Sequence, residues 1–298
     1  MRIFETKIQP GSQLADIPLK DLRLPQDVLA GLIFRNNRMI IPHGDDYLLP
    51  HDNTFFVGAS GEIEKFSKHF VGTGIKAPER VMIIGAGRTG RTLAKMLDKQ
   101  GVQVKVIEKD AERSRMVAER IEEGIVVRGD GTDIDLLTQE GVGEADVVIC
   151  LTADDKLNLM LALLAKHLGA ARTIVRVARI EYVDLMEKVG VDIVLSSRLL
   201  AAGEILAFAR RGGVVSVALL EGAKAEAMEV IVQKGSYVEN KKLMDLQLPK
   251  ECLICAFVRD DEAFVPTGQS SLQAGDRAIL FIRMEFANKV MKYFAGKA

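Results

Sequence analysis

The sequence predicts an α/β protein in which a doubly wound parallel sheet is flanked by two small α+β modules. Three observations predict this fold class. Strand-like and helix-like segments alternate through the middle of the chain, one of the strands runs into a glycine-rich turn, and about seventy residues at the start resemble those at the end. The chain has 298 residues, 48 % of them hydrophobic, which suffices for two or three domains with cores of their own.

Short apolar segments alternate with amphipathic segments in the central part. Strands are expected near residues 80–84, 102–107, 124–128, 147–151, 173–177 and 192–195, and helices near 88–100, 111–123, 133–140, 155–168 and 181–189. This alternation predicts a parallel sheet with helices on both faces. A further helix is expected over 197–211, either as a crossover or pairing helix or as a helix that covers a sheet of its own subunit.

The two ends of the chain repeat one another without a gap at a constant offset of 224 residues, the separation of Gly11 from Gly235. Other identical pairs at this offset are Ser12 and Ser236, Pro42 and Pro266, Asp52 and Asp276, and Phe70 and Phe294. In each copy we expect a strand, a short helix after Gly-Ser, three more strands and a final helix. Glycine-rich joints over 71–74 and 211–213 then divide the chain into a first module (1–71), a central domain (78–212) and a second module (213–298).

Charge and hydropathy exclude several classes of protein. The 40 basic and 41 acidic residues nearly balance, so no overall field favours binding to nucleic acid or to an anionic lipid surface. The sequence contains no uncharged apolar run of about 18 residues and no secretory signal near its start, which predicts a cytoplasmic protein without direct membrane insertion. Three cysteines, an odd number, fit a reducing compartment. Cys150 ends an apolar strand and is expected in the core.

Cys252 and Cys255 form a Cys-x-x-Cys pair, a spacing found in redox motifs and zinc sites. The surrounding segment is strand-like, and residues three apart on a strand face opposite sides. The repeat places Val28 and Gly31 at the same two positions, and the four histidines are scattered. We therefore expect neither a metal site nor a redox role.

The strongest local signal is the Gly-x-Gly-x-x-Gly turn that follows the strand near 80–84. Gly85 permits a tight turn from strand to helix, Gly87 lets the backbone approach a pyrophosphate, and Gly90 lets the helix pack closely on the strand. Free N–H groups at the start of the helix then hold the anion. The motif, with a strand before it and a helix after it, predicts a Rossmann-like nucleotide-binding domain.

A carboxylate supports this interpretation. Glu108 lies 23 residues after Gly85, at the end of the next strand, where it can accept hydrogen bonds from both ribose hydroxyls of an adenosine. The same carboxylate would repel a 2′-phosphate. NAD or an adenine nucleotide is therefore favoured over NADP.

Further candidate residues follow the other strands, because ligands of such sheets bind outside the carboxyl ends of the strands. Asp130 is expected near the adenine edge, and Thr152 near a ribose or phosphate. Asp155 is expected only to cap a helix. Arg176 lies in an otherwise apolar strand and requires an anionic partner, either a phosphate or a structural acid. Arg88, inside the glycine-rich turn, is expected to contact a phosphate or a neighbouring subunit.

The residues needed for turnover do not stand out. A dehydrogenase requires a general acid or base near the nicotinamide and a domain that holds the substrate. No His-Asp, Ser-Tyr-Lys or Cys-His arrangement stands out, and two similar flanking modules suit sensing or assembly. We expect binding without catalysis. The alternatives are an NAD-dependent oxidoreductase and a sensor whose modules take up a cyclic dinucleotide or a cation.

The order of module, nucleotide domain and module, together with five motifs, resembles the TrkA family of bacterial potassium uptake. The motifs are IGAGRTG at 84–90, VIEKD at 106–110, GDGT at 129–132, LTADD at 151–155 and NLMLALLAKHLG at 158–169. In that family the central part is an RCK N-terminal (TrkA-N) domain and each small module is an RCK C-terminal (TrkA-C) domain. The resemblance covers essentially the whole chain.

The resemblance implies a regulatory subunit that binds NAD(H), and also ADP or ATP, and is peripheral on the inner face of the cell membrane. It implies a homo-oligomer that gates a membrane potassium transporter of the TrkH/TrkG type, with no catalytic and no metal-binding residues. The implied cofactor-binding residues are Gly85, Ala86, Gly87, Arg88, Thr89, Gly90, Glu108, Asp130, Thr152, Ala153 and Arg176.

One departure concerns the length of the chain. Full TrkA proteins resemble two tandem copies of nucleotide domain plus module. Here the first nucleotide domain is absent and Met1 stands at the start of the first module. The sequence is therefore expected to be either a fragment or a shortened natural variant.

Overall fold

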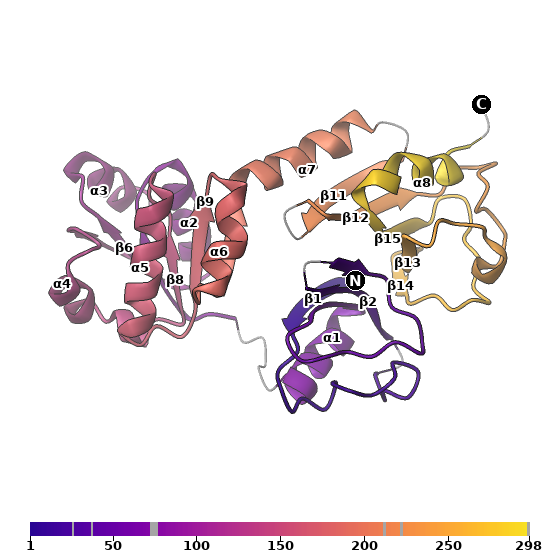
Figure 1. Cartoon of the computed structure of the whole chain (residues 1–298). Helices are drawn as coiled ribbons and strands as arrows, with labels where there is room; N and C mark the ends of the chain where they lie inside the picture. The colour runs from indigo at the N-terminus through magenta and orange to yellow at the C-terminus, as the bar shows by residue number, and fades with distance from the viewer. Residues whose placement is uncertain (26, 37, 72–76, 211–212, 221–222, 297–298) are drawn as a thin grey trace. The chain divides into compact units, whose positions relative to one another are not determined.

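The computed structural model describes residues 1–25, 27–36, 38–71, 77–210, 213–220 and 223–296 (Figure 1). The chain forms two compact units. One comprises Ala77–Leu200, here called the central unit, and the other combines Met1–Lys76 with Ala201–Ala298. The joints expected over 71–74 and 211–213 lie outside the described residues, except for Val71 and Gly213 at their margins.

The central unit contains a parallel sheet of six strands. They are β5 (Arg80–Ile84), β6 (Gln103–Glu108), β7 (Ile125–Arg128), β8 (Val147–Cys150), β9 (Thr173–Val177) and β10 (Ile193–Ser196). Their spatial order is β10-β9-β8-β5-β6-β7, so the order of the strands reverses between β5 and β8. The doubly wound fold class is confirmed, and this reversal is where such sheets bind ligands.

Helices cover both faces of this sheet. They are α2 (Arg88–Asp98), α3 (Ala111–Ala118), α4 (Ile134–Gln139), α5 (Asp155–His167) and α6 (Val183–Lys188). Residues of α2 and α3 belong to one hydrophobic cluster, and residues of α4, α5 and α6 belong to the other. All four residues of β8, including Cys150, are buried, as expected for a strand covered on both faces.

Helix α3 ends at Ala118, whereas the sequence predicts it to continue to residue 123. The cause is Asp98, at the end of α2. Its carboxylate accepts hydrogen bonds from the N–H groups of Glu122 (2.7 Å) and Gly124 (2.8 Å). The bond from Glu122 is the main reason that the pKa of Asp98 is lowered. Because these N–H groups donate to Asp98 and not to the carbonyl groups four residues earlier, the helix cannot continue to residue 123.

The first module contains β1 (Arg2–Lys7), β2 (Val28–Arg35), β3 (Arg38–Ile40), β4 (Asn53–Gly58) and the helix α1 (Ser60–Phe66). The second contains β11 (Val214–Leu220), β12 (Ala225–Ile231), β13 (Cys252–Arg259), β14 (Glu262–Phe264), β15 (Arg277–Arg283) and the helix α8 (Ala287–Phe294). The antiparallel orders, β1-β4-β2-β3 and β11-β12-β15-β13-β14, are the same except for the added strand β11.

Details of the two modules also repeat. Arg35 pairs with Asp52, and Arg259 with Asp276, in both cases through two hydrogen bonds of 2.9 and 2.7 Å. Both aspartates are almost fully buried. A buried carboxylate needs such a partner, so the ion pair explains why this aspartate is present in both copies.

The short helix expected after Gly-Ser is not an α-helix in either module. Turns occupy this segment in the first module, and the second has only a 3₁₀ turn over Leu243–Asp245. Asp16 and its counterpart Asn240 both have left-handed backbone angles, with φ of 62° and 58°. A right-handed helix cannot pass through such a residue.

Helix α7 (Ser197–Ala209) packs against the second module through its C-terminal half. A Cβ added to Gly203 would lie 2.5 Å from the carbonyl oxygen of Val217 on β11, so only glycine permits this approach. Arg210 follows the helix and pairs with the fully buried Glu226 on β12. The helix therefore covers a sheet of its own subunit. Among the described residues, no helix combines the length and apolar character needed to cross a bilayer.

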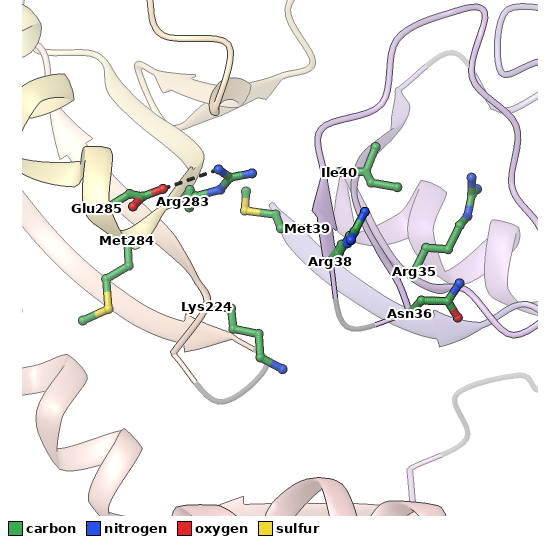
Figure 2. A pocket seen from close by; sticks show the side chains of 9 residues that line it. All are labelled: Arg35, Asn36, Arg38, Met39, Ile40, Lys224, Arg283, Met284 and Glu285. Atoms are coloured by element: carbon green, nitrogen blue, oxygen red, sulfur yellow. Dashed lines mark hydrogen bonds and ion pairs between the residues drawn. The ribbon is translucent and has the colours of Figure 1, made fainter.

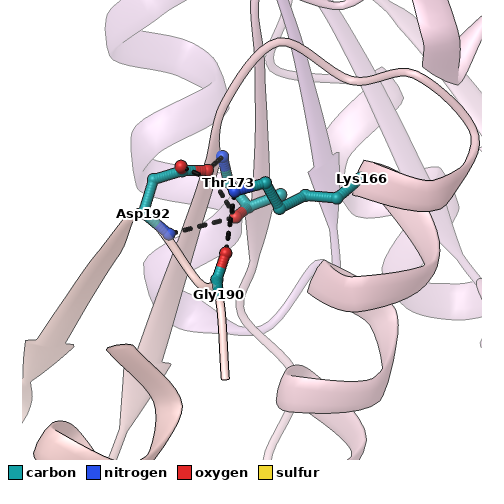
Figure 3. A network of polar contacts seen from close by, with 4 residues as sticks. All are labelled: Lys166, Thr173, Gly190 and Asp192. Carbon is teal, nitrogen blue, oxygen red and sulfur yellow. Dashed lines mark hydrogen bonds and ion pairs between the residues drawn. The ribbon is translucent and has the colours of Figure 1, made fainter. Parts of the chain in front are cut away.

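Asp192 fastens the edge strand β10 to the central unit (Figure 3). Its carboxylate accepts hydrogen bonds from Lys166 Nζ (2.7 Å), Thr173 N (2.8 Å) and Thr173 Oγ1 (2.9 Å), and Lys166 also donates to the carbonyl of Gly190 (2.8 Å). Burial alone would raise the pKa of Asp192. The bonds from Lys166 and Thr173 outweigh burial and leave this pKa below its usual value.

We predict that Asp192→Asn lowers the free energy of unfolding by about 1–2 kcal/mol at pH 7, because one charge-assisted interaction is lost. A carboxyl whose folded-state pKa is lowered stabilises the protein above its unfolded pKa of about 3.9 and loses this effect as the pH falls. Urea unfolding should therefore show the two proteins converging below about pH 4. Glu181→Gln, at an exposed carboxyl of the same unit, is the control and should have little effect. A difference that persists undiminished at low pH would contradict the prediction.

Candidate functional site

The turn after β5 is shaped by two glycines that have no room for a side chain. Gly85 has a φ of +106°, and a Cβ there would lie 2.9 Å from the carbonyl carbon of Leu151. A Cβ on Gly90 would lie 2.0 Å from the carbonyl oxygen of Gly85. The turn is therefore pressed against the end of β8, and α2 against the turn. Both contacts match the roles predicted for these two glycines.

Gly87 differs from its neighbours, because a Cβ placed on it would have no atom within 4 Å. It is the N-cap of α2, and no side chain caps the helix. The first intrahelical bond runs from Arg91 N to Gly87 O (3.0 Å), so the N–H groups of Arg88, Thr89 and Gly90 have no partner within the helix. Open space in front of such N–H groups is suited to an anion.

Glu108 ends β6 beside this turn and is 6 % exposed. Its two carboxylate oxygens accept hydrogen bonds from Ala86 N (2.6 Å) and Asp110 N (3.0 Å). Each oxygen retains a second lone pair that can accept a hydroxyl. Because Ala86 donates its N–H to Glu108, it holds the carboxylate in place and does not contribute to the anion site.

One pocket of about 380 Å³ brings most of the expected residues together. Nine of them line it: Gly85, Gly87, Arg88, Thr89, Glu108, Asp130, Thr152, Ala153 and Arg176. Ala86 and Gly90 do not line it, since one faces Glu108 and the other packs on the turn. The pocket lies at the carboxyl ends of β5, β6, β8 and β9, where the strand order reverses.

Asp130 lines the pocket, but its carboxylate is partly engaged. Its Oδ1 atom accepts hydrogen bonds from Thr132 N (3.0 Å) and Thr132 Oγ1 (2.9 Å). The backbone bond from Thr132, followed by the hydroxyl bond, lowers the pKa of Asp130. The side chain is thus held in a fixed orientation at the pocket edge.

Asn158 is a buried residue that the sequence did not single out. Its Oδ1 atom accepts hydrogen bonds from Thr152 N (2.9 Å) and Thr152 Oγ1 (2.6 Å), and its Nδ2 atom donates to the carbonyls of Thr152 (3.2 Å) and Arg176 (3.0 Å). The amide thus ties the turn after β8 to β9, two segments that line the pocket. A polar residue inside the apolar run of 157–165 was the available signal.

Asp155 does not cap α5, contrary to expectation. Asp154 is the N-cap and accepts hydrogen bonds from Lys156 N and Leu157 N. Asp155 instead accepts from Ala178 N (2.9 Å) and Arg179 N (3.0 Å), the residues directly after β9. The first turn of α5 therefore holds the loop beyond the neighbouring strand, a contact between residues 23 apart in the sequence.

Arg176 lines the pocket with a nitrogen that lacks a partner. Its Nε atom is buried and makes no hydrogen bond, and no ion pair of Arg176 forms among the residues that the structure describes. Buried polar groups are nearly always hydrogen-bonded. Of the two partners expected from sequence, no structural acid pairs with Arg176 among the residues that the structure describes.

Lys109 and Arg113 also line the pocket and were not expected. They follow Glu108 by one and five residues, on the loop and first turns leading into α3. Their positive charges add to that of Arg176. The pocket therefore carries cationic side chains beside the buried carboxylate of Glu108, a combination suited to a phosphorylated ligand with hydroxyl groups.

A second hollow, of about 1120 Å³, lies where the two modules adjoin (Figure 2). It is lined by Arg35, Asn36, Arg38, Met39, Ile40, Lys224, Arg283, Met284 and Glu285. Arg35 is engaged by Asp52, and Arg283 lies 3.4 Å from Glu285. Its charged side chains are partly or largely exposed, and none of the unpaired buried atoms found in the described residues belongs to them. The central pocket is the stronger candidate.

The Cys-x-x-Cys pair lies in the second module, where Cys255 is buried and Cys252 is half-buried. Burial raises the pKa of Cys252 to about 12 and also raises that of Cys255. Cys255 lies at a bulge in β13, and its Sγ atom donates to the carbonyl of Ile279 (3.1 Å). Metal binding and redox chemistry both require the thiolate, which this environment disfavours.

We predict opposite outcomes for two neighbouring glycines. Gly90→Ala should lower the free energy of unfolding by about 2–4 kcal/mol, because the new methyl group meets a backbone atom that cannot move away. Gly87→Ala should leave stability nearly unchanged, because the space is open and its φ of −61° is compatible with alanine. Urea unfolding of both variants tests this pair. Equal destabilisation would contradict the assignment of Gly87 to ligand contact and Gly90 to packing.

Comparisons with known proteins agree with this architecture. The TrkA-N domain model matches residues 81–197, and the TrkA-C domain model matches residues 3–71 and 227–295. The chain is 36 % identical over 297 residues to "Trk system potassium uptake protein TrkA homolog 2" of Methanosarcina mazei, covering 99 % of this chain and 66 % of that protein. It is 33 % identical over 287 residues to "Trk system potassium uptake protein TrkA" of Vibrio alginolyticus, covering 94 % and 62 %.

The chain thus spans about two thirds or less of the length of these curated relatives. Among solved structures, the GsuK channel is similar in fold, with a TM-score of 0.50 and 22 % identity, over 98 % of this chain and 52 % of the channel chain. The TrkA-N and TrkA-C domain models together match most of the chain, and curated TrkA proteins align with nearly all of it. The chain belongs to the TrkA family of proteins built from TrkA-N and TrkA-C domains.

Proposed function

We propose that this chain is a regulatory subunit of a potassium uptake system that binds NAD(H), or ADP or ATP, in its central pocket. One observation carries the proposal. The uncapped start of α2 and the carboxylate of Glu108 line the same pocket, at the point where the strand order of the sheet reverses. The names of the relatives, potassium uptake proteins, support the process. On this proposal the subunit is cytoplasmic and acts at the inner face of the membrane.

The pocket chemistry suggests how a dinucleotide would lie. Its pyrophosphate would meet the N–H groups of Arg88 and Thr89 in the open space at Gly87, and a phosphate oxygen would satisfy Arg176 Nε. The adenosine ribose would donate its hydroxyls to Glu108. A 2′-phosphate at that position would meet a buried carboxylate, so NAD should bind more tightly than NADP.

The lining of the pocket favours binding without turnover. Among the described lining residues there is no histidine, cysteine, tyrosine or serine. Its carboxylates are engaged, since Glu108 holds Ala86 N, Asp130 holds Thr132 and Asp154 caps α5. A hydride-transfer enzyme needs a positioned proton donor or acceptor, and these groups already have structural roles.

A route for the signal follows from the polar contacts beneath the pocket. Asn158 joins Thr152 to Arg176, and Asp155 holds the backbone just beyond β9. From there the chain passes through α6 and β10 into α7, which packs on the second module. We propose that nucleotide binding changes the angle between paired central domains of a homo-oligomer. A ligand shifts such an equilibrium only by binding one state better, so different nucleotides can act in opposite directions.

The first test is calorimetric titration with NADH, NAD⁺, ATP and ADP in the absence of any other substrate. We expect saturable binding of at least one nucleotide, and weaker binding of the NADP counterpart. Gly87→Ala should weaken binding at least about tenfold without loss of stability, because its methyl group occupies the ligand space. Glu181→Gln is the control and should bind as the parent protein does. Absence of binding by all four nucleotides, or unchanged affinity in Gly87→Ala, would overturn the proposed pocket.

The second test is transport. In membranes that contain a potassium transporter partner of the TrkH/TrkG type, nucleotide addition should change the rate of potassium uptake when this subunit is present. Glu108→Ala should remove both nucleotide binding and the nucleotide response. If Glu108→Ala abolishes binding but uptake still responds to nucleotide, regulation does not pass through this pocket. Sustained, substrate-dependent NADH oxidation would instead favour an oxidoreductase.

A further inference from the structure

The first and second modules meet through one face of each sheet. A single hydrophobic cluster joins Leu32, Phe34, Phe55 and Val57 of the first module to Ala225, Ala227, Cys255, Ala256 and Phe281 of the second. All nine side chains are at most 6 % exposed. We call these two surfaces the paired faces. Their burial is as complete as that of a domain core, so the contact is specific and not a loose surface encounter.

The paired faces meet around positions that are equivalent in the repeat. Gly31 and Cys255 are separated by the offset of 224 residues, and a Cβ built on Gly31 lies 3.6 Å from the Cβ of Cys255. In a twofold pairing of like surfaces, residues close to the axis meet their own counterparts. The modules therefore pair around a pseudo-twofold axis that passes near these two residues.

The pairing is nevertheless unequal in side-chain size. Position 57 of the first module is valine, whereas its counterpart in the second module is Phe281. The Cε2 and Cδ2 atoms of Phe281 lie 2.6 and 2.8 Å from the position of a Cβ on Gly31. Such distances are too short for any side chain. The phenylalanine ring therefore occupies space that exists only because position 31 has no side chain.

The ring cannot readily move away. Phe281 is fully buried, and its ring packs edge-on against Phe55 with the centroids 6.2 Å apart. Close-packed interiors resist such displacements, because neighbouring side chains would also have to shift. The backbone of Gly31 does not itself demand glycine, since its φ lies outside the left-handed region. The requirement for glycine at this position comes from the opposing face.

We infer that the paired faces select each other by size, so that the first module pairs with the second module of its own chain and not with a like module of another copy. Pairing two second modules in this geometry would set Phe281 against Cys255, which has the Cβ that Gly31 lacks. Pairing two first modules would set Val57 against Gly31 and leave a void. Only the unlike pair fills the space without overlap, a device that rejects wrong partners as well as favouring the right one.

The packing of the paired faces limits how copies of this chain can associate. Because the paired faces satisfy one another within the chain, they are not available to a second copy. Any association of copies must use other surfaces.

A double-mutant cycle tests the size selection in the full chain. Gly31→Cys gives the first module the residue of the second and should lower the midpoint of thermal unfolding by roughly 4–10 °C. Phe281→Val alone opens a cavity and should also lower it. Together the two changes should cost clearly less than the sum of their separate effects. Gly61→Cys, at a site with no atom within 4 Å of the new Cβ, is the matched control. Additive effects, or no effect of Gly31→Cys, would overturn the inference.

A crosslink then tests which modules pair. In the Gly31→Cys/Phe281→Val chain the new thiol lies opposite Cys255, with a Cβ separation of 3.6 Å that suits a disulfide. Oxidised glutathione, as the oxidant, takes up the two hydrogens lost when the sulfurs join. We expect a disulfide within one chain, seen as a linked peptide in a product of monomer mass. The Gly61→Cys/Phe281→Val chain should form no such link. A disulfide between chains, or none at these positions, would contradict pairing within the chain.

Discussion

The approach of the β5 turn to the end of β8 is the constraint on which the candidate site depends. Gly85 lies so close to the backbone of Leu151 and Thr152 that a Cβ has no room there, and a Cβ on Gly90 has no room beside the backbone of Gly85. Three backbone segments therefore approach one another where side chains would otherwise separate them. This contact leaves the start of α2 facing the open space at Gly87 and places Glu108 beside it. An anion site of this kind uses backbone groups and therefore requires little from the side chains around it.

Two buried polar side chains and one half-buried carboxylate hold the loops around the pocket in place. Glu108 fixes Ala86, Asn158 fixes Thr152 and the carbonyl of Arg176, and Asp155 fixes the residues after β9. The bonds of Ala86 with Glu108, of Asn158 with Arg176 and of Ala178 with Asp155 link segments that belong to neighbouring strands, at the edge where the pocket lies. A satisfied network of this kind is rigid, because breaking one bond leaves a buried group unpaired. The same groups that shape the pocket therefore connect it to the next elements of the fold.

The duplicated modules show how a repeat can diverge without losing its architecture. Apart from the added strand β11, strand order is the same in both copies, and so are the bulge in β2 and β13 and the Arg–Asp pair with its buried aspartate. The paired faces differ at Gly31 and Val57 against Cys255 and Phe281, where the copies touch. Features that each module needs for its own fold have been kept, and features at the contact between modules have become complementary.

The fold class, the repeat and nine of the residues that line the pocket could be predicted from the sequence. Hydrophobic alternation, glycine spacing and self-similarity are local or periodic, so they can be read along the chain. Other features became visible only in the folded protein. They are the end of α3 at Ala118, which Asp98 causes, and the left-handed backbone of Asp16 and Asn240. The bond from Ala86 to Glu108 and the buried role of Asn158 also belong here. So does the packing of Phe281 against Gly31. Most of these features depend on contacts between residues far apart in sequence, and such contacts exist only after the chain has folded.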